Sequence, residues 1–146
     1  MRAEDILDDP KIDAVFIPLP NSLHFEWAVR TIRAGKHVLL EKPSASNATE
    51  AGILFNLPEL SVPNGPVLLE AFHNRFHPAI HLFRSLFNPA DVVHVYTENM
   101  IPWWLTAKEN IEFNYSLSGG SMMMWVTFHV SNLSWSLRDL LVAGIS

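Results

Sequence analysis

Two short apolar runs separated by an amphipathic segment constrain the fold of this chain more than any other feature of its sequence. The runs Ala14–Ile17 and His37–Leu40 have the length and apolar character of parallel strands that are covered on both faces. Between them, Leu23, Trp27 and Ile32 predict an amphipathic helix. Strand, helix and strand within about thirty residues predict a βαβ unit, which crosses over right-handedly in nearly all cases.

The ends of that helix carry their own signals. Asn21 and Ser22 offer side chains that could cap its beginning. Ala34-Gly35-Lys36 predicts its end, because glycine readily takes the left-handed conformation of a C-terminal cap. We expect these further elements: a helix around Glu4–Asp8, a helix from Ser46 or Asn47 to about Asn56, a strand over Val67–Ala71, a helix from Pro78 to near Phe87, strand-like residues Val92–Thr97 and an apolar helix after Ser118-Gly119-Gly120.

Three candidate parallel strands make an incomplete sheet. The end strands of such a sheet would expose unpaired backbone groups and apolar faces. The 146 residues are 49% hydrophobic and only 17% charged, so the chain has enough apolar side chains for a real core. From the residues alone, we therefore predict a piece of a larger α/β protein.

Composition and charge exclude several classes of protein. The net charge is −5 and the ten basic residues are scattered, which argues against nucleic acid or a membrane surface as a partner. The absence of cysteine excludes disulfide scaffolds and cysteine-ligated zinc. Polar and charged residues interrupt the apolar stretch Ser121–Leu141, so we expect a buried helix there and not a membrane span. The N-terminus has no signal-like apolar core, and we expect a cytoplasmic protein.

Polar groups gather at the carboxyl ends of the two best-defined strands. Asn21 and Ser22 follow the first strand, and Glu41 and Lys42 follow the second. Ligands bind just outside these ends in open α/β sheets. The alternative interpretations are helix capping for the first pair and a solvated surface lysine for Lys42.

The same segments resemble the Gfo/Idh/MocA oxidoreductase family. The resemblance rests on Pro20-Asn21-Ser22-Leu23-His24 and on Gly35-Lys36-His37-Val38-Leu39-Leu40-Glu41-Lys42-Pro43. Farther on, the segment Glu70–Pro78 resembles the branch that holds dimeric dihydrodiol dehydrogenases and NADP-dependent D-xylose dehydrogenases. The family implies a Rossmann nucleotide-binding domain followed by an α/β domain with an open sheet, which is often used for dimerisation.

The resemblance also implies a fold class and domain boundaries. We expect an α/β chain with a partial Rossmann-type parallel sheet, followed by the start of an open-sheet C-terminal domain. Residues 1–76 would be the C-terminal part of the nucleotide-binding domain, and residues 77–90 a connecting helix. Residues 91–146 would be the incomplete start of the substrate or dimerisation domain. The chain would then be truncated at both ends.

Site residues are carried over from the family position by position. Lys42 would be catalytic and would hydrogen-bond the reacting hydroxyl, near the nicotinamide. A desolvated ammonium suits an oxygen that becomes negative as hydride leaves its carbon. The residues that would bind the cofactor are Pro20, Asn21, His24, Glu41, Lys42 and Arg75. The implied reaction transfers hydride from a sugar or vicinal-diol alcohol carbon to NADP, and the implied partners are that small substrate and a second subunit in a homodimer.

Two sites depart from the family pattern. The six glycines, at positions 35, 52, 65, 119, 120 and 144, form no Gly-x-Gly-x-x-Gly turn to hold a pyrophosphate. Met124 and Phe128 occupy the positions of the family's acid–base pair, and His129 lies one position late. We therefore expect this chain to be inactive, and whether it binds NADP is open.

Three other interpretations remain. The first is a non-catalytic binding or interaction protein with the same fold. The second is a zinc site at His73, His77 and His81, which are spaced by four, although Pro78 interrupts them and we expect no metal. The third is a sugar-stacking role for Trp103 and Trp104, for which core or interface packing is the simpler explanation.

Overall fold

A three-stranded parallel sheet is the centre of the computed structural model, which describes residues 3–88, 91–94 and 114–118. The strands are β1 (Ala14–Ile17), β2 (His37–Leu40) and β3 (Leu68–Glu70), in the order β1-β2-β3. Ile17 pairs with Leu40, and Leu40 pairs with Glu70, so the three strands end at the same edge of the sheet. The predicted α/β class and the predicted Rossmann-type parallel sheet are confirmed.

The helices are α1 (Ala3–Asp8), α2 (Asn21–Arg33), α3 (Ala48–Phe55), η1 (Pro58–Ser61), η2 (His73–Phe76), α4 (Pro78–Ser85) and α5 (Tyr115–Ser118), where η marks a 3-10 helix. Four of the helices, α1, α2, α3 and α4, match the predicted ones, whereas η1, η2 and α5 were not predicted. Gly35 has φ +76°, the left-handed conformation that was expected at the end of α2. Residues 92–94 form no strand, and residues 95–97 lie outside the described part, as do Trp103, Trp104 and the predicted helix after Ser118.

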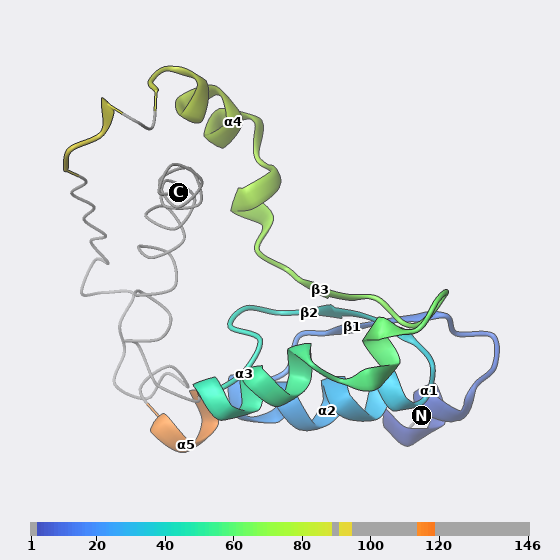
Figure 1. Cartoon of the computed structure of the whole chain (residues 1–146). Helices are drawn as coiled ribbons and strands as arrows, with labels where there is room; N and C mark the ends of the chain where they lie inside the picture. Colours follow the sequence, from blue (N-terminus) through green and yellow to red (C-terminus); the bar gives the residue numbers. More distant parts are fainter. Residues whose placement is uncertain (1–2, 89–90, 95–113, 119–146) are drawn as a thin grey trace.

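In the described part of the chain, helices cover one face of the sheet, and the prediction that both faces are covered stays a prediction. α2 and α3 lie on the same side of the strands (Figure 1). The order β1-β2-β3 advances in one direction, and crossovers of the same hand then place both connecting helices on the same side. Leu40 points to this side and is fully buried, whereas its neighbour Leu39 is 39% exposed and Phe16 of β1 is 52% exposed.

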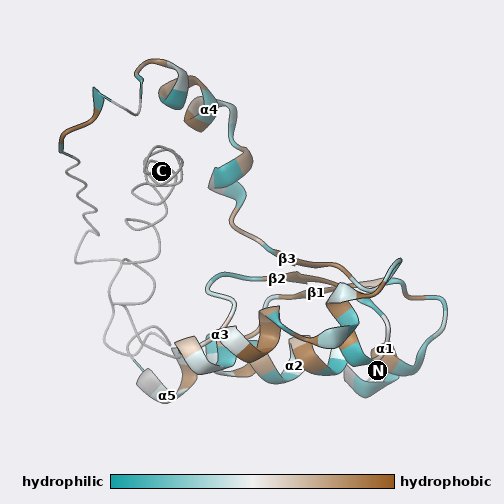
Figure 2. Cartoon of the chain, viewed as in Figure 1, coloured by the Kyte–Doolittle hydropathy of each residue, from teal (hydrophilic) through white to brown (hydrophobic). Residues whose placement is uncertain are grey.

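The core lies between the covered face and the helices. Figure 2 shows that the strands are hydrophobic for most of their length. The buried cluster consists of Ile17, Ala28, Ile32, Val38, Leu40, Leu54 and Leu57. Burying one Leu or Ile side chain fully contributes about 1.5–3 kcal/mol, so this cluster is the main source of stability in the described part.

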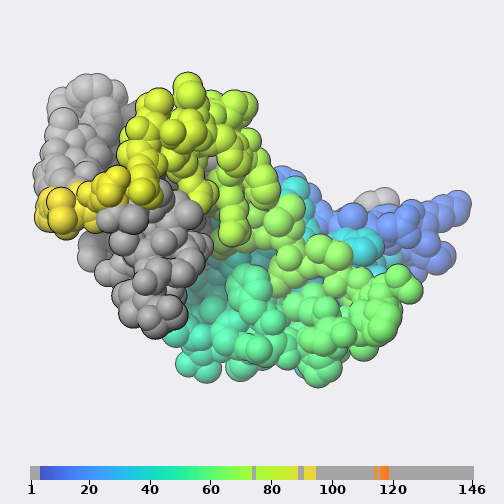
Figure 3. Space-filling model, turned by 45° about the horizontal axis from the view of Figure 1, so that its top comes forward, coloured from blue at the N-terminus to red at the C-terminus, as the bar shows by residue number. Residues whose placement is uncertain are grey.

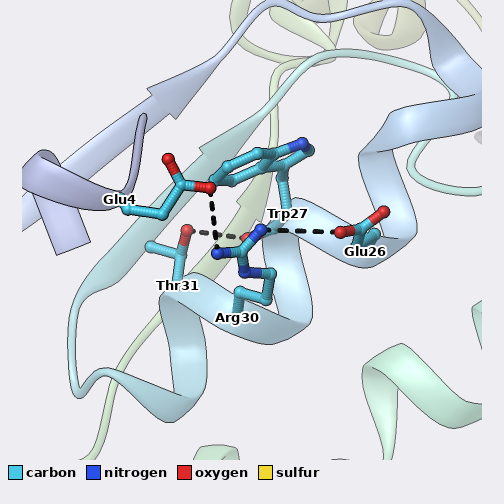
Figure 4. A network of polar contacts seen from close by, with 5 residues as sticks. All are labelled: Glu4, Glu26, Trp27, Arg30 and Thr31. Carbon is cyan, nitrogen blue, oxygen red and sulfur yellow. Dashed lines mark hydrogen bonds and ion pairs between the residues drawn. The ribbon is translucent and has the colours of Figure 1, made fainter. Parts of the chain in front are cut away.

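A polar cluster fixes α1 to the outer surface of α2 (Figure 4). The Arg30 guanidinium lies 4.2 Å from the centroid of the Trp27 ring and forms ion pairs with Glu4 of α1 and Glu26 of α2. The Thr31 hydroxyl donates to the Trp27 carbonyl oxygen at 2.7 Å. Exposed ion pairs of this kind contribute little, so the cluster orients α1 more than it stabilises the fold.

The chain leaves the sheet after β3 and continues through η2 into α4, which stands apart from the strands (Figure 1). In Figure 3, α1 and α4 lie at opposite ends of the visible face. Leu82, Phe83 and Leu86 are exposed here. None of the helices in the described ranges combines the length and the apolar character that a membrane crossing needs. The domain boundaries given above stay a prediction.

Candidate functional site

The candidate site lies where β1 and β2 end. Parallel pairing places Ile17 and Leu40 side by side, so the segments that follow them leave the sheet at the same edge. One segment runs through Pro20 into α2, and the other is the loop 41–47, which leads to α3. The two polar groups of the sequence analysis are therefore brought to one edge of the sheet, as predicted.

Asn21 does not cap α2, and the capping interpretation of Asn21 and Ser22 is wrong. Pro20 occupies the N-cap position of α2 with ψ 143°, so Asn21 is the first residue inside the helix. The Pro20 side chain has no acceptor atom and cannot cap the helix. Its side-chain amide instead donates to the Ser118 carbonyl oxygen at 2.6 Å. This contact brings α5 to the beginning of α2, beside the candidate site (Figure 1).

His24 is completely buried under the two segments. Its Nδ1 lies 2.7 Å from the carbonyl oxygen of Pro43, and its Nε2 lies 2.7 Å from the carbonyl oxygen of Leu19. One ring therefore bridges the segment after β1 and the segment after β2. Both ring nitrogens of His24 therefore contact backbone atoms of this chain.

Lys42 lies in the loop that follows β2, half-buried, with Glu41 before it and a cis bond to Pro43 after it. Its backbone N–H donates to the Glu41 carboxylate at 3.1 Å. Desolvation by burial lowers the pKa of the Lys42 ammonium below its usual value of 10.5, and the nearby Glu41 carboxylate opposes that shift. Lowered lysine pKa values are typical of groups that exchange protons, and also of lysines that are simply desolvated.

Glu70, the last residue of β3, holds the loop from the other side. Its Oε1 accepts hydrogen bonds from the Ser44 backbone N–H at 3.0 Å and from the Ser44 hydroxyl at 2.6 Å. Sequence analysis gave neither residue a role in the site. The available signal was a carboxylate at the end of a third predicted strand, because the ends of neighbouring parallel strands meet at one edge.

The far end of the loop is fixed by the beginning of α3. The Asn47 side chain accepts from the Glu50 backbone N–H at 2.9 Å, and the Glu50 carboxylate accepts from the Ser46 backbone N–H at 3.0 Å. This reciprocal arrangement is of the capping-box type. The loop that carries Lys42 is thus held by α2, β3 and α3 together.

The remaining predicted residues lie elsewhere. Arg75 is exposed on η2, beyond the end of β3, and Met124, Phe128 and His129 fall outside the described residues. His77 caps α4, where its Nδ1 accepts from the Ala79 backbone N–H at 3.1 Å. Within the part of the chain that the structure describes, no three His, Asp or Glu residues gather as a metal site.

Polar side chains lie where β1 and β2 end, at one edge of the sheet. They include Asn21, Glu41 and Lys42, and ligands of open α/β sheets bind outside the carboxyl ends of the strands. The chain has no glycine-rich turn that would let backbone N–H groups approach a pyrophosphate.

Comparison with known proteins shows similarity to oxidoreductases. A family model described as an oxidoreductase family with an NAD-binding Rossmann fold matches residues 2–59. The chain is 36% identical over 121 residues to D-xylose 1-dehydrogenase (NADP(+)) 2 of Haloferax volcanii, covering 82% of this chain and 36% of that protein. It is 39% identical over 72 residues to scyllo-inositol 2-dehydrogenase (NADP(+)) IolW of Bacillus subtilis, covering 49% of this chain and 19% of that protein. The chain thus spans about a third of the first relative and less of the second.

Solved structures show the same fold. KijD10, a 3-ketoreductase from Actinomadura kijaniata crystallised with NADP, superposes with a TM-score of 0.52 at 37% identity, over 57% of this chain and 26% of that one. An oxidoreductase domain protein from Kribbella flavida gives a TM-score of 0.76 over 94% of this chain and 37% of that one. Its identity is only 23%, so this second similarity concerns the fold alone.

Proposed function

Since the chain belongs to the Gfo/Idh/MocA oxidoreductase family, we propose that the loop 41–47 forms the nicotinamide end of an NADP-binding crevice. The proposed reaction is hydride transfer between NADP and the alcohol carbon of a sugar or a vicinal diol. Names of the relatives support the sugar class, since they include a D-xylose dehydrogenase and a scyllo-inositol dehydrogenase, both described as NADP-dependent.

The position and the desolvation of Lys42 carry this proposal. Its pKa is lowered because burial disfavours the ammonium, while the loop around it is held by hydrogen bonds on three sides. A lysine with such surroundings has a fixed backbone and a charged group that releases its proton more readily than a solvated lysine does.

The chemistry assigned to Lys42 follows from the change at the substrate oxygen. NADP, when bound, accepts the hydride. As the alcohol carbon becomes a carbonyl carbon, its hydroxyl group must release a proton. The Lys42 side chain donates a hydrogen bond to this oxygen while negative charge develops on it, and in a low-dielectric site such a bond is stronger than in water.

The residues at two positions of the sequence argue against turnover. Met124 and Phe128 occupy the positions of the family's acid–base pair, and their side chains cannot exchange protons. We therefore propose that turnover by this chain is negligible, although the loop around Lys42 retains the architecture of the site.

Two measurements with one pair of variants test the proposal. NADPH binding, followed by its fluorescence, is expected to weaken about tenfold in Lys42→Ala, which corresponds to about 1.4 kcal/mol. Lys11→Ala, at an exposed lysine, is the matched control and is expected to bind as the wild type does. Equal affinity in all three proteins would contradict the assignment of Lys42. Steady NADP reduction with D-xylose, above that of Lys42→Ala, would contradict the proposed inactivity.

A non-catalytic interaction protein is the second candidate, and a specific observation favours it. Beside β1 lies an apolar hollow of about 140 Å³ between α1 and α2, whose lining includes Ile6, Phe16 and Trp27. Together with the exposed face of the sheet, it is an apolar surface of the kind that protein partners cover. Under this alternative the chain would bind a protein partner and show no NADPH affinity that depends on Lys42.

A further inference from the structure

Charge is distributed unevenly between two ends of the chain. Residues 3–13, which contain α1 and the turn before β1, hold five carboxylates and a single basic residue, Lys11. Residues 71–90, which contain η2 and α4, hold no acidic residue and carry Arg75, Arg84 and three histidines. Because α1 and α4 lie at opposite ends of the face in Figure 3, the net charge of −5 combines an acidic end with a basic one.

The acidic end carries the apolar hollow between α1 and α2. Its volume is about 140 Å³, and Thr31 is the only polar residue among those that line it. The Thr31 hydroxyl donates to the Trp27 carbonyl oxygen, so the side chains of the lining present an apolar surface. An apolar cavity of about 150 Å³ stays dry and binds benzene. The hollow therefore has room for one aromatic or branched aliphatic side chain.

The basic end carries apolar side chains that are open to solvent. Leu82, Phe83 and Leu86 are 63%, 46% and 72% exposed, and their spacing places them on one face of α4 and of the residue that caps it. Within the described ranges, Arg75 and Arg84 form no ion pair with a carboxylate. An apolar group of this kind, accompanied by charges of one sign, is typical of a surface that binds another protein.

We propose that α4 of one copy of this chain binds the α1 end of a second copy, with Leu86 in the apolar hollow. Two complementary features support a second copy as the occupant. The basic residues of 71–90 meet the carboxylates of 3–13, and an exposed aliphatic side chain meets a hollow with room for it. Contacts between two acidic ends, or between two basic ends, would bring like charges together.

The proposed contact joins two different surfaces, so it is heterologous. A pair of copies keeps a free hollow at one end and a free α4 at the other, and such contacts form open chains unless a ring closes. The second candidate function assigns the hollow to a protein partner, and this inference names that partner as another copy. It does not rest on the proposed reaction, because none of these residues belongs to the loop 41–47.

The first test follows association of the wild-type chain by sedimentation velocity, without NADPH. We expect the mass to rise with concentration beyond that of a dimer. The apparent dissociation constant should rise about tenfold between about 50 mM and about 500 mM NaCl, because salt screens the charges at the contact. A chain that stays monomeric at every concentration, or that associates more strongly at high salt, would overturn the proposal and leave the proposed reaction untouched.

The second test blocks each surface in a separate variant. Leu86→Glu places a carboxylate on the α4 face, and Phe16→Lys places an ammonium at the hollow, where Phe16 is 52% exposed. We expect neither variant to associate alone, whereas their equimolar mixture forms a 1:1 complex, because each variant supplies the surface that the other lacks. The complex should stop at two chains, since both of its outer surfaces are blocked. Recovery in the mixture also shows that both variants are folded.

Two residues of α3 provide matched controls. Ile53 and Phe55 are each 50% exposed and lie outside both surfaces, so Ile53→Glu and Phe55→Lys should associate as the wild type does. Loss of association in these controls, or a mixture of Leu86→Glu and Phe16→Lys that stays monomeric, would contradict the proposed contact. A closed dimer that none of the four substitutions changes would use another surface and would also overturn it.

Discussion

The two ends of the central strand each carry a lysine, and the two lysines have different surroundings. Lys36 precedes β2 and is only 6% exposed, and its ammonium donates to the carbonyl oxygens of Asp9 and Ile12 at 2.7 Å each. Lys42 follows β2 and is half-buried in a loop whose backbone is held by α2, β3 and α3. At the amino end of β2, the Lys36 ammonium itself holds the loop before β1 in place. At the carboxyl end of β2, neighbouring elements hold the backbone of the loop 41–47. The Lys42 ammonium of this loop lies at the candidate site.

This difference teaches that burial of a lysine does not by itself indicate function. Lys36 is the more buried of the two, and its ammonium binds two carbonyl oxygens of the loop before β1, which it fastens to β2. Lys42 has the lowered pKa, caused first by desolvation. If this interpretation is right, substitutions at the amino end change stability, and substitutions at Lys42 change binding.

The largest expected effect on stability is at Lys36. In Lys36→Met the carbonyl groups of Asp9 and Ile12 lose their donor, and hydrogen bonds to a charged group contribute about 1.5–3 kcal/mol each. We expect the free energy of unfolding in urea to fall by about 3 kcal/mol. Lys11→Met, at an exposed position, is the control and should change it by less than about 0.5 kcal/mol. Equal stability of the two variants would remove the contrast between the two ends.

Glu70 is expected to have the next largest effect. In Glu70→Ala the Ser44 N–H and hydroxyl groups lose their common acceptor, which costs about 1–3 kcal/mol when such groups are buried. Glu70→Gln keeps an acceptor and should lose less. The measurement is urea unfolding together with the ¹⁵N–¹H signal of the Ser44 amide. A Ser44 signal that stays in place in Glu70→Ala would show that β3 does not hold this loop.

Substitution of Asn47, at the far end of the loop 41–47, is expected to have a smaller effect on stability. Asn47→Ala removes the acceptor for the Glu50 backbone N–H, and the loss of such an N-cap costs about 1 kcal/mol. Asn47→Asp keeps a capping oxygen and should restore most of the stability in thermal unfolding. If Asn47→Ala and Asn47→Asp are equally destabilised, the cap does not contribute as described.

Lys42→Met is expected to have the smallest effect on stability at neutral pH, within about 0.5 kcal/mol. Its effect should depend on pH. The folded pKa of Lys42 lies below the unfolded value of about 10.4, so in the interval between them the unfolded chain binds more protons. Stability of the wild type therefore rises with pH in that interval, relative to Lys42→Met. The check is urea unfolding of both proteins at about pH 7 and about pH 10, and a relative decrease would contradict the direction of the shift.

Local signals made much of the fold predictable. The apolar runs predicted β1 and β2 at their observed bounds, and Gly35 with φ +76° ends α2 where glycine was expected to end it. The helix α3 begins at Ala48, one residue after the predicted start at Ser46 or Asn47. Each of these signals is contained in a few consecutive residues, and each reflects a conformational preference of the residues themselves.

Coverage of the sheet was not predictable in the same way. The apolar runs of β1 and β2 are continuous, but only one face of each strand is covered by helices in the described part. The difference depends on the strand order and on the direction of the crossovers, which no single segment encodes.

The candidate site shows the same division. Lys42 was placed correctly at the end of β2, because a strand boundary is a local feature. The bonds of Ser44 to Glu70 and of Asn21 to Ser118 were missed, since they join residues far apart in the sequence. The roles of Pro20, Asn21, Glu41, Lys42 and Arg75 toward a cofactor stay predictions.

One measurement tests the central claim most directly. The chain has four lysines, so a sample labelled with [¹³Cε]lysine gives a simple spectrum, which can be followed while NADPH is added. We predict that the Lys42 signal moves with saturating dependence on NADPH, and that the Lys36 signal, from the opposite end of β2, stays in place. A stationary Lys42 signal, or a Lys36 signal that moves as much, would contradict the assignment of the carboxyl end as the cofactor crevice.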